Sequence, residues 1–483
     1  MIEKSLGAKA ATGAIWASID KFSSMVLQFL VNLILARLLL PSDFGAIGML
    51  TIFISVSQVL IDGGFGSALI QKKNPTQSDY STIFFWNIFF STIIYLFIFI
   101  LSPYIGDFFS MPILSKILRV VGLGIIVNSV LDIQATRLRK NLAFKKLAIT
   151  NLGSYSLSAT IAIISAYNGF GVWSLVIMQL SYGIFSIIVL RIISGWSPSF
   201  SFSKESLKGL FYFGGYIMAS NILQEICRNI QGIIIGRSFS ATQMGYYSQA
   251  QKLDTIVSYS IPQVIVQVMY PVYSSVQDDK DKLIDIIKMN LRVIAVLIFP
   301  ILVVLIILAN ILIEFLYGNK WVNSVIYFQI LCCGGFFVCL QNVNYYAVAA
   351  IGKSKPLFIW SFYKWFFLIL SIFIGSLWGM NGIMWGMVCG SINIYVINAL
   401  LTSKYVGLRF YYQIKCLSPI FLTTIISVSL SYIASLIIHN DVLICMIFGF
   451  CYVVICLISK LKALDDLKLI INKITETHKL KFI

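Results

Sequence analysis

The chain has 483 residues, of which 59% are hydrophobic and only 11% are charged, and its mean hydropathy is +0.89. This composition excludes a soluble globular protein, in which about a quarter of the residues are charged. The net charge of +17 does not indicate nucleic-acid binding either, because the basic residues flank apolar segments and no soluble stretch interleaves them with aromatic residues.

Apolar segments recur with short gaps from residue 12 to residue 459. Each is long enough to cross the roughly 30 Å hydrocarbon core of a bilayer as an α-helix. We therefore expect an all-α integral membrane protein with about fourteen transmembrane helices and no folded domain outside the membrane. The expected spans are 12–36, 44–69, 81–102, 113–136, 147–167, 171–193, 209–236, 246–273, 290–315, 325–350, 357–379, 382–403, 416–437 and 441–459.

The basic residues alternate from gap to gap. Every second gap, together with both ends of the chain, is rich in lysine and arginine, and these regions hold 26 of the 36 basic residues. The intervening gaps hold only Arg37, Arg237 and Lys320. Since basic loops stay in the cytoplasm, the alternation predicts a multi-pass membrane protein with both termini in the cytoplasm. The two longest gaps, 194–208 and 274–289, are then cytoplasmic.

The first and seventh spans each carry a polar face. In the first span the face consists of Asp20, Ser24, Gln28 and Asn32, spaced four residues apart, with Lys21 beside it. In the seventh span the corresponding residues are Asn221, Gln224, Glu225, Arg228 and Gln231. An offset of 200 residues superposes the two faces and matches Gln28 with Arg228.

The same offset reveals an internal repeat. Segments 36–45 and 236–245 share three features. Each has an arginine, Arg37 or Arg237, at the end of one span. Each then has a Ser or Thr suited to capping the next helix and a glycine in the first turn of that helix. At these outer span ends the two arginines are equally suited to holding a loop and to contacting a ligand. Two units of six spans share one orientation, so we expect parallel repeats related by an axis along the membrane normal.

This repeat divides the chain. We expect an N-terminal six-helix bundle at 1–208, a second six-helix bundle at 209–404, two additional transmembrane helices at 405–459 and a cytoplasmic tail at 460–483. The polar faces of the leading spans are expected to line a central cavity between the two bundles.

Further polar residues lie inside other spans. Gln58 and Asp62 belong to the second span, Lys252 and Asp254 to the eighth, and Lys364 to the eleventh. A charge at mid-helix costs roughly 2.5–3.5 kcal/mol on insertion scales, so each needs a partner or a water-filled cavity. Structural roles stay open, because the lysines and Asp254 are also able to reach a membrane interface.

Glu225 and Arg228 have a structural alternative of their own. They lie three residues apart on one expected helix, a spacing that also suits an internal ion pair.

The sequence indicates no metal site, cofactor or catalytic centre. Its nine cysteines lie in or at the ends of spans without metal-ligand spacing, and its two histidines, His439 and His478, lie in a short loop and the tail. With no large loop to hold an active site, we expect a protein that is not an enzyme.

Several short segments resemble the Wzx-type polysaccharide flippases, the O-antigen and capsule transporters of the multidrug/oligosaccharidyl-lipid/polysaccharide exporter superfamily. The resemblance covers about residues 5–440. No single motif is specific, and the resemblance rests on the order and spacing of the motifs. The matching segments are Ala36-Arg37-Leu38 to Phe44-Gly45, Gly63-Gly64-Phe65-Gly66 with Ala68-Leu69-Ile70-Gln71, Arg137-Leu138-Arg139-Lys140 to Phe144, Gly169-Phe170-Gly171-Val172-Trp173 and Gly245-Tyr246-Tyr247-Ser248.

This resemblance implies twelve core helices in two lobes around a cavity, with two extra helices here. It implies a bacterial inner-membrane protein that flips an undecaprenyl-diphosphate-linked oligosaccharide from the inner to the outer leaflet by alternating access. The product would enter lipopolysaccharide, capsule or exopolysaccharide biosynthesis. Expected partners are this lipid-linked oligosaccharide, membrane lipids, and a polysaccharide polymerase with its chain-length machinery; nucleic acid is not one.

We assign two sets of candidate residues on this basis. Arg228 is expected to bind the diphosphate, because a planar guanidinium fork suits phosphate oxygens. The full substrate-binding set is Arg228, Lys21, Lys252, Gln28, Gln58, Gln224, Asn221, Arg37 and Arg237. The ion-coupling set is Asp20, Asp62, Glu225 and Asp254. A proton and a sodium ion both remain open as the coupling ion, and glycan flow into polymerisation is an alternative source of direction.

Other functions remain as alternatives. A multidrug (MATE-like) exporter shares the fold but favours an acidic cavity for cationic cargo, and a lipid II flippase is closer in chemistry. A polytopic glycosyltransferase or ligase would act on similar lipids, but it needs a larger loop for its catalytic residues.

Overall fold

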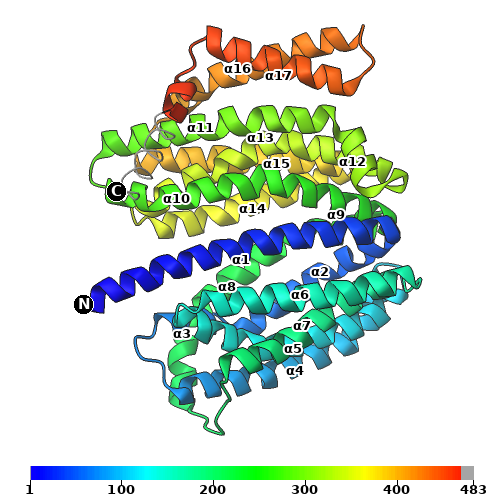
Figure 1. Cartoon of the computed structure of the whole chain (residues 1–483), viewed down its shortest axis with the longest axis vertical. Coiled ribbons are helices and arrows are strands. Elements are labelled where there is room, and N and C mark those ends of the chain that lie inside the picture. The colour runs from blue at the N-terminus through cyan, green and yellow to red at the C-terminus, as the bar shows by residue number, and fades with distance from the viewer. Residues whose placement is uncertain (1, 469–483) are drawn as a thin grey trace. The chain divides into compact units, whose positions relative to one another are not determined.

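A computed structural model describes residues 2–468, without the side chains of 2–11, 14, 213–214, 216–217 and 354. Every element in this range is helical, which confirms the all-α prediction. Residues 469–483, the larger part of the predicted tail, lie outside the described residues. The chain folds into two compact units, unit 1 at Met1–Gly245 and unit 2 at Tyr246–Ile483 (Figure 1).

Twelve of the described helices are long and apolar enough to cross a membrane. The predicted seventh and eighth spans are not among the twelve. They correspond to helices rich in polar residues, and the predicted count of fourteen therefore stays a prediction.

Unit 1 is built from long helices packed in pairs. Helix α1 packs on α6, α6 on α7, α5 against both α4 and α7, and α2 on α8 (Figure 1). The helices of unit 1 are α1 (Ile2–Leu38), α2 (Pro41–Asp62), α3 (Phe65–Gln71), α4 (Gln77–Phe108), α5 (Ile113–Lys140), α6 (Phe144–Tyr167), α7 (Val172–Ser194) and α8 (Lys204–Ser238), followed by the start of α9 (Ala241–Thr255). Helix α8, which the repeat assigns to the second bundle, therefore packs with the helices of unit 1.

The starts of α2 and α9 cross at their glycines. A Cβ atom on Gly45 would lie 1.7 Å from the carbonyl oxygen of Ala241, and one on Gly245 would lie 1.8 Å from that of Pro41. Pro41 and Ala241, like Gly45 and Gly245, are matched by the 200-residue offset, so the contact is reciprocal. These repeated glycines allow the two helix starts to touch backbone to backbone.

The residues that cap α2 and α9 differ from the Ser and Thr expected from the repeat. Helix α2 begins at Pro41 after Leu40, whose N–H group donates to the carboxylate of Asp43 at 2.9 Å. At α9 the hydroxyl of Ser240 accepts from the N–H group of Gln243 at 3.2 Å. The capping groups thus lie just outside the predicted Ser or Thr positions.

The segment between α7 and α8 folds back along the start of α4. The indole N–H of Trp196 donates to Gln77 Oε1 at 2.7 Å, and the backbone N–H of Ser199 donates to the Ser81 hydroxyl at 2.9 Å. The side chain of Trp196 is buried. This segment, predicted only as a long gap, is therefore packed against unit 1.

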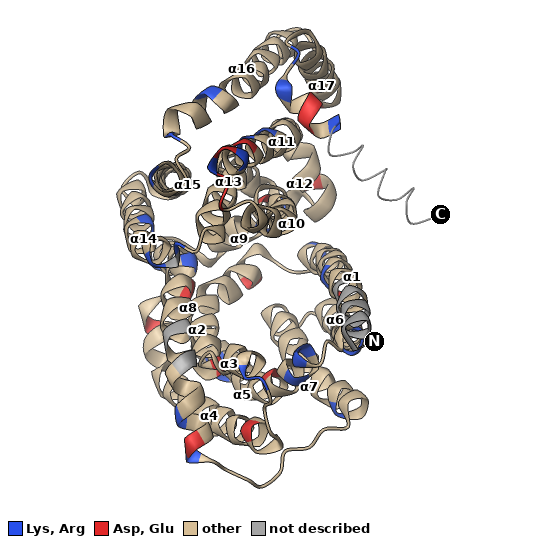
Figure 2. Cartoon of the chain, turned by 90° about the vertical axis from the view of Figure 1, so that its left-hand side faces the viewer, with Lys and Arg blue, Asp and Glu red and all other residues tan. Residues whose placement is uncertain are grey.

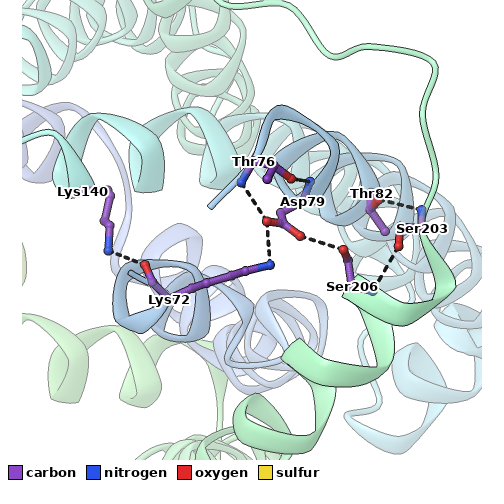
Figure 3. A network of polar contacts seen from close by, with 7 residues as sticks. All are labelled: Lys72, Thr76, Asp79, Thr82, Lys140, Ser203 and Ser206. Atoms are coloured by element: carbon purple, nitrogen blue, oxygen red, sulfur yellow. Dashed lines mark hydrogen bonds and ion pairs between the residues drawn. The ribbon is translucent and has the colours of Figure 1, made fainter. Parts of the chain in front are cut away.

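A buried carboxylate joins three helices at this end of unit 1 (Figure 3). Asp79, 1% exposed, accepts hydrogen bonds from Lys72 Nζ at 2.7 Å and the backbone N–H of Thr76 at 2.7 Å. It also accepts from the hydroxyl of Ser206 at 2.6 Å. Since Lys72 follows α3 and Ser206 lies in the first turn of α8, Asp79 ties α3 and α8 to the start of α4. We call these residues the Asp79 cluster.

Unit 2 is organised around α13, which contacts α10, α11 and α15 (Figure 1). Helix α14 packs on α15, and α16 and α17 form a hairpin that contacts α11. The helices are α10 (Ile261–Ser275), α11 (Lys280–Ile307), α12 (Ala309–Tyr317), α13 (Val325–Ala350), α14 (Ser354–Ser376), α15 (Gly379–Tyr405), α16 (Phe410–Ser435) and α17 (Asp441–Ile458). A π-helical turn at Ile256–Ser260 joins α9 to α10, and a 3₁₀ turn at Asn319–Ser324 leads into α13.

Basic residues gather at helix ends. The last turns of α5, α7 and α15 carry Arg137, Arg191 and Lys404, and Figure 2 shows Lys and Arg in blue at helix ends turned toward the viewer. This placement is the one that membrane-spanning helices with charged flanks require.

Candidate substrate and ion sites

The carboxylate of Asp20 on α1 is held by a side chain of α6, which in turn accepts a hydrogen bond from α7. Asn151 Nδ2 donates to the two oxygens of Asp20 at 3.2 and 3.0 Å, and Tyr182 donates to Asn151 Oδ1 at 3.4 Å. The Ser24 hydroxyl also donates to Asp20, at 3.4 Å. No lysine or arginine in the described part of the chain forms an ion pair with Asp20. The hydrogen-bond partners of the Asp20 carboxylate in the described residues are therefore neutral donors.

Gln58 joins α2 to α5. Its Nε2 donates to Asp132 Oδ2 at 2.8 Å, and its Oε1 accepts from Asn128 Nδ2 at 3.3 Å. Asp62, one helical turn further along α2, interacts electrostatically with Asp132 and with Arg139. Two carboxylates and one guanidinium thus share the contact between α2 and α5, and Gln58 is positioned to orient Asp132.

Arg228 and Gln224 form an exposed polar pair on α8. Both side chains are exposed, and no described residue makes a hydrogen bond or ion pair with the Arg228 guanidinium. Lys21 and Gln28 on α1 are exposed as well, whereas Asn221 is half-buried. Hydrocarbon leaves such groups unsatisfied, so they require water or a polar ligand.

Glu225 is bound to a neutral residue. Asn229 Nδ2 donates to Glu225 Oε2 at 2.9 Å and to the Ser55 hydroxyl on α2 at 3.3 Å. In the described residues, Glu225 and Arg228 do not form an ion pair with each other. The structure therefore favours separate roles for these two side chains.

Arg37 and Arg237 both have exposed side chains at their helix ends. Arg237 Nη1 donates to the carbonyl oxygen of Phe108 at 2.6 Å, and its guanidinium lies 5.3 Å from the ring centroid of Phe108. It also approaches the hydroxyl of Ser110 at 3.4 Å. These contacts fix the turn between α4 and α5, which is the loop-holding role left open for Arg237.

Two candidates lie in unit 2, on α9. Lys252 has an exposed side chain, and Asp254 is half-buried. The hydroxyl of Ser258 donates to Asp254 Oδ1 at 2.5 Å across the π-helical turn at Ile256–Ser260. Such turns occur frequently at functional sites.

The structure adds polar partners that lie outside the predicted substrate-binding and ion-coupling sets. Asp20, Gln58 and Glu225 each bond to residues outside the predicted set, namely Asn151 with Tyr182, Asp132 with Asn128, and Asn229. In the sequence these partner residues are marked only by being polar within apolar spans. That mark does not reveal which helices pack against each other. Among the described residues, no group of three or more His, Cys, Asp or Glu side chains could hold a metal ion.

The arrangement of helices is one that solved membrane transporters share. The lipid II flippase MurJ in an inward closed conformation matches with a TM-score of 0.72 at 17% identity, over 92% of this chain and 98% of that one. An inward-facing multidrug resistance MATE family transporter matches with a TM-score of 0.64 at 13% identity, over 80% and 98%. The chain thus has the fold of these multi-pass membrane proteins, in agreement with its twelve helices long and apolar enough to cross a membrane.

The family follows from the sequence itself. Residues 34–326 match the family described as "Polysaccharide biosynthesis protein", and the chain belongs to this family. It is 24% identical to the lipopolysaccharide biosynthesis protein WzxC of Escherichia coli over 82% of this chain and 81% of that protein. It is 25% identical to the teichuronic acid biosynthesis protein TuaB of Bacillus subtilis, over 72% and 73%. The succinoglycan biosynthesis transport protein ExoT of Rhizobium meliloti is 24% identical, over 72% and 70%. These matches confirm the predicted resemblance.

Proposed function

We propose that this protein flips an undecaprenyl-diphosphate-linked oligosaccharide from the inner to the outer leaflet of the bacterial inner membrane by alternating access. The flipped unit would feed the synthesis of a cell-surface polysaccharide. The family match and the transport function named for ExoT support this proposal. Both chain ends would lie in the cytoplasm, on the side of the basic loops.

The observation that carries the proposal is the exposed polar pair on α8. Arg228 and Gln224 are exposed on a helix that packs on α2 within unit 1. A diphosphate needs a cation with several donors, and an oligosaccharide needs groups that both donate and accept hydrogen bonds. An exposed guanidinium beside an exposed amide offers both.

The remaining candidates extend this chemistry. Lys21 and Lys252 would contribute further positive charge, and Gln28 and Asn221 further amide groups. The neutral surroundings of Asp20 and Glu225 support the proposal that carboxylates couple transport to a proton or sodium gradient.

Replacing Arg228 tests the proposed diphosphate contact. Arg228→Ala should abolish flipping without lowering the amount of membrane-inserted protein, because the side chain holds no structural partner in the described residues. Arg228→Lys should retain part of the activity, since it keeps the charge and loses the planar fork. The assay is flipping of a lipid-linked oligosaccharide by purified protein in liposomes.

Lys73→Ala is the matched control, because Lys73 is an exposed cation in the turn between α3 and α4. It should flip like the wild type. Wild-type activity in Arg228→Ala would remove Arg228 from the proposed site.

A further inference from the structure

A buried lysine lies among three helices of unit 2. Lys364 on α14 is 6% exposed, and its Nζ donates to Asn398 Oδ1 on α15 at 3.0 Å. The same Nζ lies 5.5 Å from the ring centroid of Tyr345 on α13. We call Lys364, Asn398, Tyr345, Gln341 and Asn344 the Lys364 cluster. Since Lys364 is the eleventh residue of α14, it lies about 15 Å along that helix, near the middle of a membrane span.

This burial overturns the simplest interpretation of Lys364. Beside Tyr363 and Trp365 in the sequence, it is suited to snorkelling to an interface. The structure instead turns its amine inward, onto an amide oxygen of the neighbouring helix. A lysine side chain is long and flexible enough to point away from the helix contact, so its inward position calls for a structural or functional explanation.

No carboxylate in the described part of the chain pairs with Lys364. The sequence contains no Asp or Glu between Glu314 and Asp441, a stretch that includes all of α13, α14, α15 and α16. The titratable group that faces the amine from α13 is Tyr345. The only charged residue of α15, Lys404, lies in its last turn with its Nζ 5.6 Å from the ring centroid of Tyr405. In the described residues an ammonium ion at Lys364 would thus have the Tyr345 ring and the Asn398 oxygen as partners but no counter-ion, so its burial favours the neutral amine more than an exposed site would.

The contact between α13 and α15 that includes Asn398 has unused hydrogen-bonding capacity. Both polar atoms of the Asn344 side chain, which is 0% exposed, lack a partner in the described residues, as does Gln341 Oε1. Asn398 Nδ2 donates to the carbonyl oxygen of Gln341 at 3.2 Å, so these groups belong to one contact between α13 and α15. Water admitted to this contact would find donors and acceptors ready to hold it.

The cluster is also close to the surface of the unit. Tyr345, whose ring stands over the amine, is 37% exposed. Where this surface faces a water-filled space, a change of the Tyr345 rotamer or a small separation of α13 from α14 would hydrate Lys364. Hydrated, the amine can carry a proton; packed as in this structure, it is better accommodated without one.

We propose that Lys364 is a proton-carrying residue of the transport cycle, binding one proton when the cluster is open to water and releasing it when the cluster closes. The reaction is the protonation of an amine to an ammonium ion and its reversal, and it requires no other reactant. This inference rests on the proposed flippase function. It adds a basic residue, in unit 2, to the acidic candidates for ion coupling.

Two substitutions fix the charge of this position in opposite ways. Lys364→Met is permanently neutral and Lys364→Arg is permanently charged. The measurement is flipping of a fluorescent polyprenyl-diphosphate-linked oligosaccharide in proteoliposomes, with and without an imposed pH gradient. We expect the gradient to accelerate the wild type and to have no effect on either variant. Lys355→Met, an exposed lysine at the start of the same helix, should respond like the wild type.

The other outcomes each overturn the proposal in a distinct way. A gradient response in Lys364→Met would make the lysine structural, and a response retained only in Lys364→Arg would make it a fixed anion contact. A wild type that flips equally with and without the gradient would remove proton coupling and leave the flippase standing. A wild type that does not flip would overturn the proposed function, and the inference with it. Should Lys364→Met fail to fold, Lys364→Gln provides the neutral variant.

Discussion

Asp79→Ala is expected to destabilise the protein by about 3 kcal/mol, since it removes a helix cap and two hydrogen bonds to a charged group. The carboxylate is 1% exposed and accepts from Lys72, the backbone N–H of Thr76 and the hydroxyl of Ser206. Ala leaves the Thr76 N–H and the Ser206 hydroxyl without this partner and frees the first turn of α8. The measurement is the free energy of unfolding in detergent.

A second pair of charges supplies the control for Asp79. Lys288 and Asp285 form an ion pair at 3.6 Å in which the Asp285 side chain is 79% exposed. Asp285→Ala should change stability by no more than about 0.5 kcal/mol, because exposed pairs contribute little. Equal losses in the two variants would contradict the role given to the Asp79 cluster.

Gly45→Ala is the second substitution with a large expected effect, about 3 kcal/mol of destabilisation. Its new Cβ would lie 1.7 Å from the carbonyl oxygen of Ala241, and a backbone atom moves aside only if the whole helix start moves. Gly245→Ala meets Pro41 in the same way, at 1.8 Å. The free energy of unfolding in detergent again measures the effect.

The double variant Gly45→Ala with Gly245→Ala provides a sharper test. Both substitutions force apart the same crossing, so the double variant should lose less than the sum of the single losses. Gly153→Ala is the control, because nothing lies within 4 Å of its Cβ position in α6. There Ala should be neutral or stabilising by up to about 1 kcal/mol. Strict additivity of the two losses would contradict a shared contact.

The sequence predicts the helices well because membrane spans have a strong signal. Long apolar segments with basic flanks can be recognised one span at a time, as for the predicted spans 81–102 and 113–136, which lie within α4 and α5. The polar α8 illustrates the limit, since its composition does not by itself show that it packs on α2 in unit 1. That contact depends on the match of two helix surfaces, which hydropathy does not encode.

The candidate sites could be predicted only in part. Charged residues in spans, such as Asp20, stand out because their burial is costly. Their neutral partners do not, because a residue such as Asn151 is also common as a hydrogen-bonding contact between helices. The packing of Trp196 against Gln77 was equally hidden, since a gap between spans reads as exposed loop.

For Lys364 the local sequence predicts an environment that differs from the one in the structure. Its aromatic neighbours in the sequence are typical of a membrane interface, yet its amine bonds to Asn398 within the unit. The direction of a long side chain depends on the helices packed around it, and the local sequence does not show which helices these are.

The most direct test of the proposed function is leaflet-resolved measurement of polyprenyl-diphosphate-linked oligosaccharide in cells with and without this protein. We predict accumulation in the inner leaflet on depletion, reversed by the wild type and not by Arg228→Ala. An unchanged distribution of this lipid, together with an altered sensitivity to cationic dyes, would contradict a flippase and indicate a drug exporter.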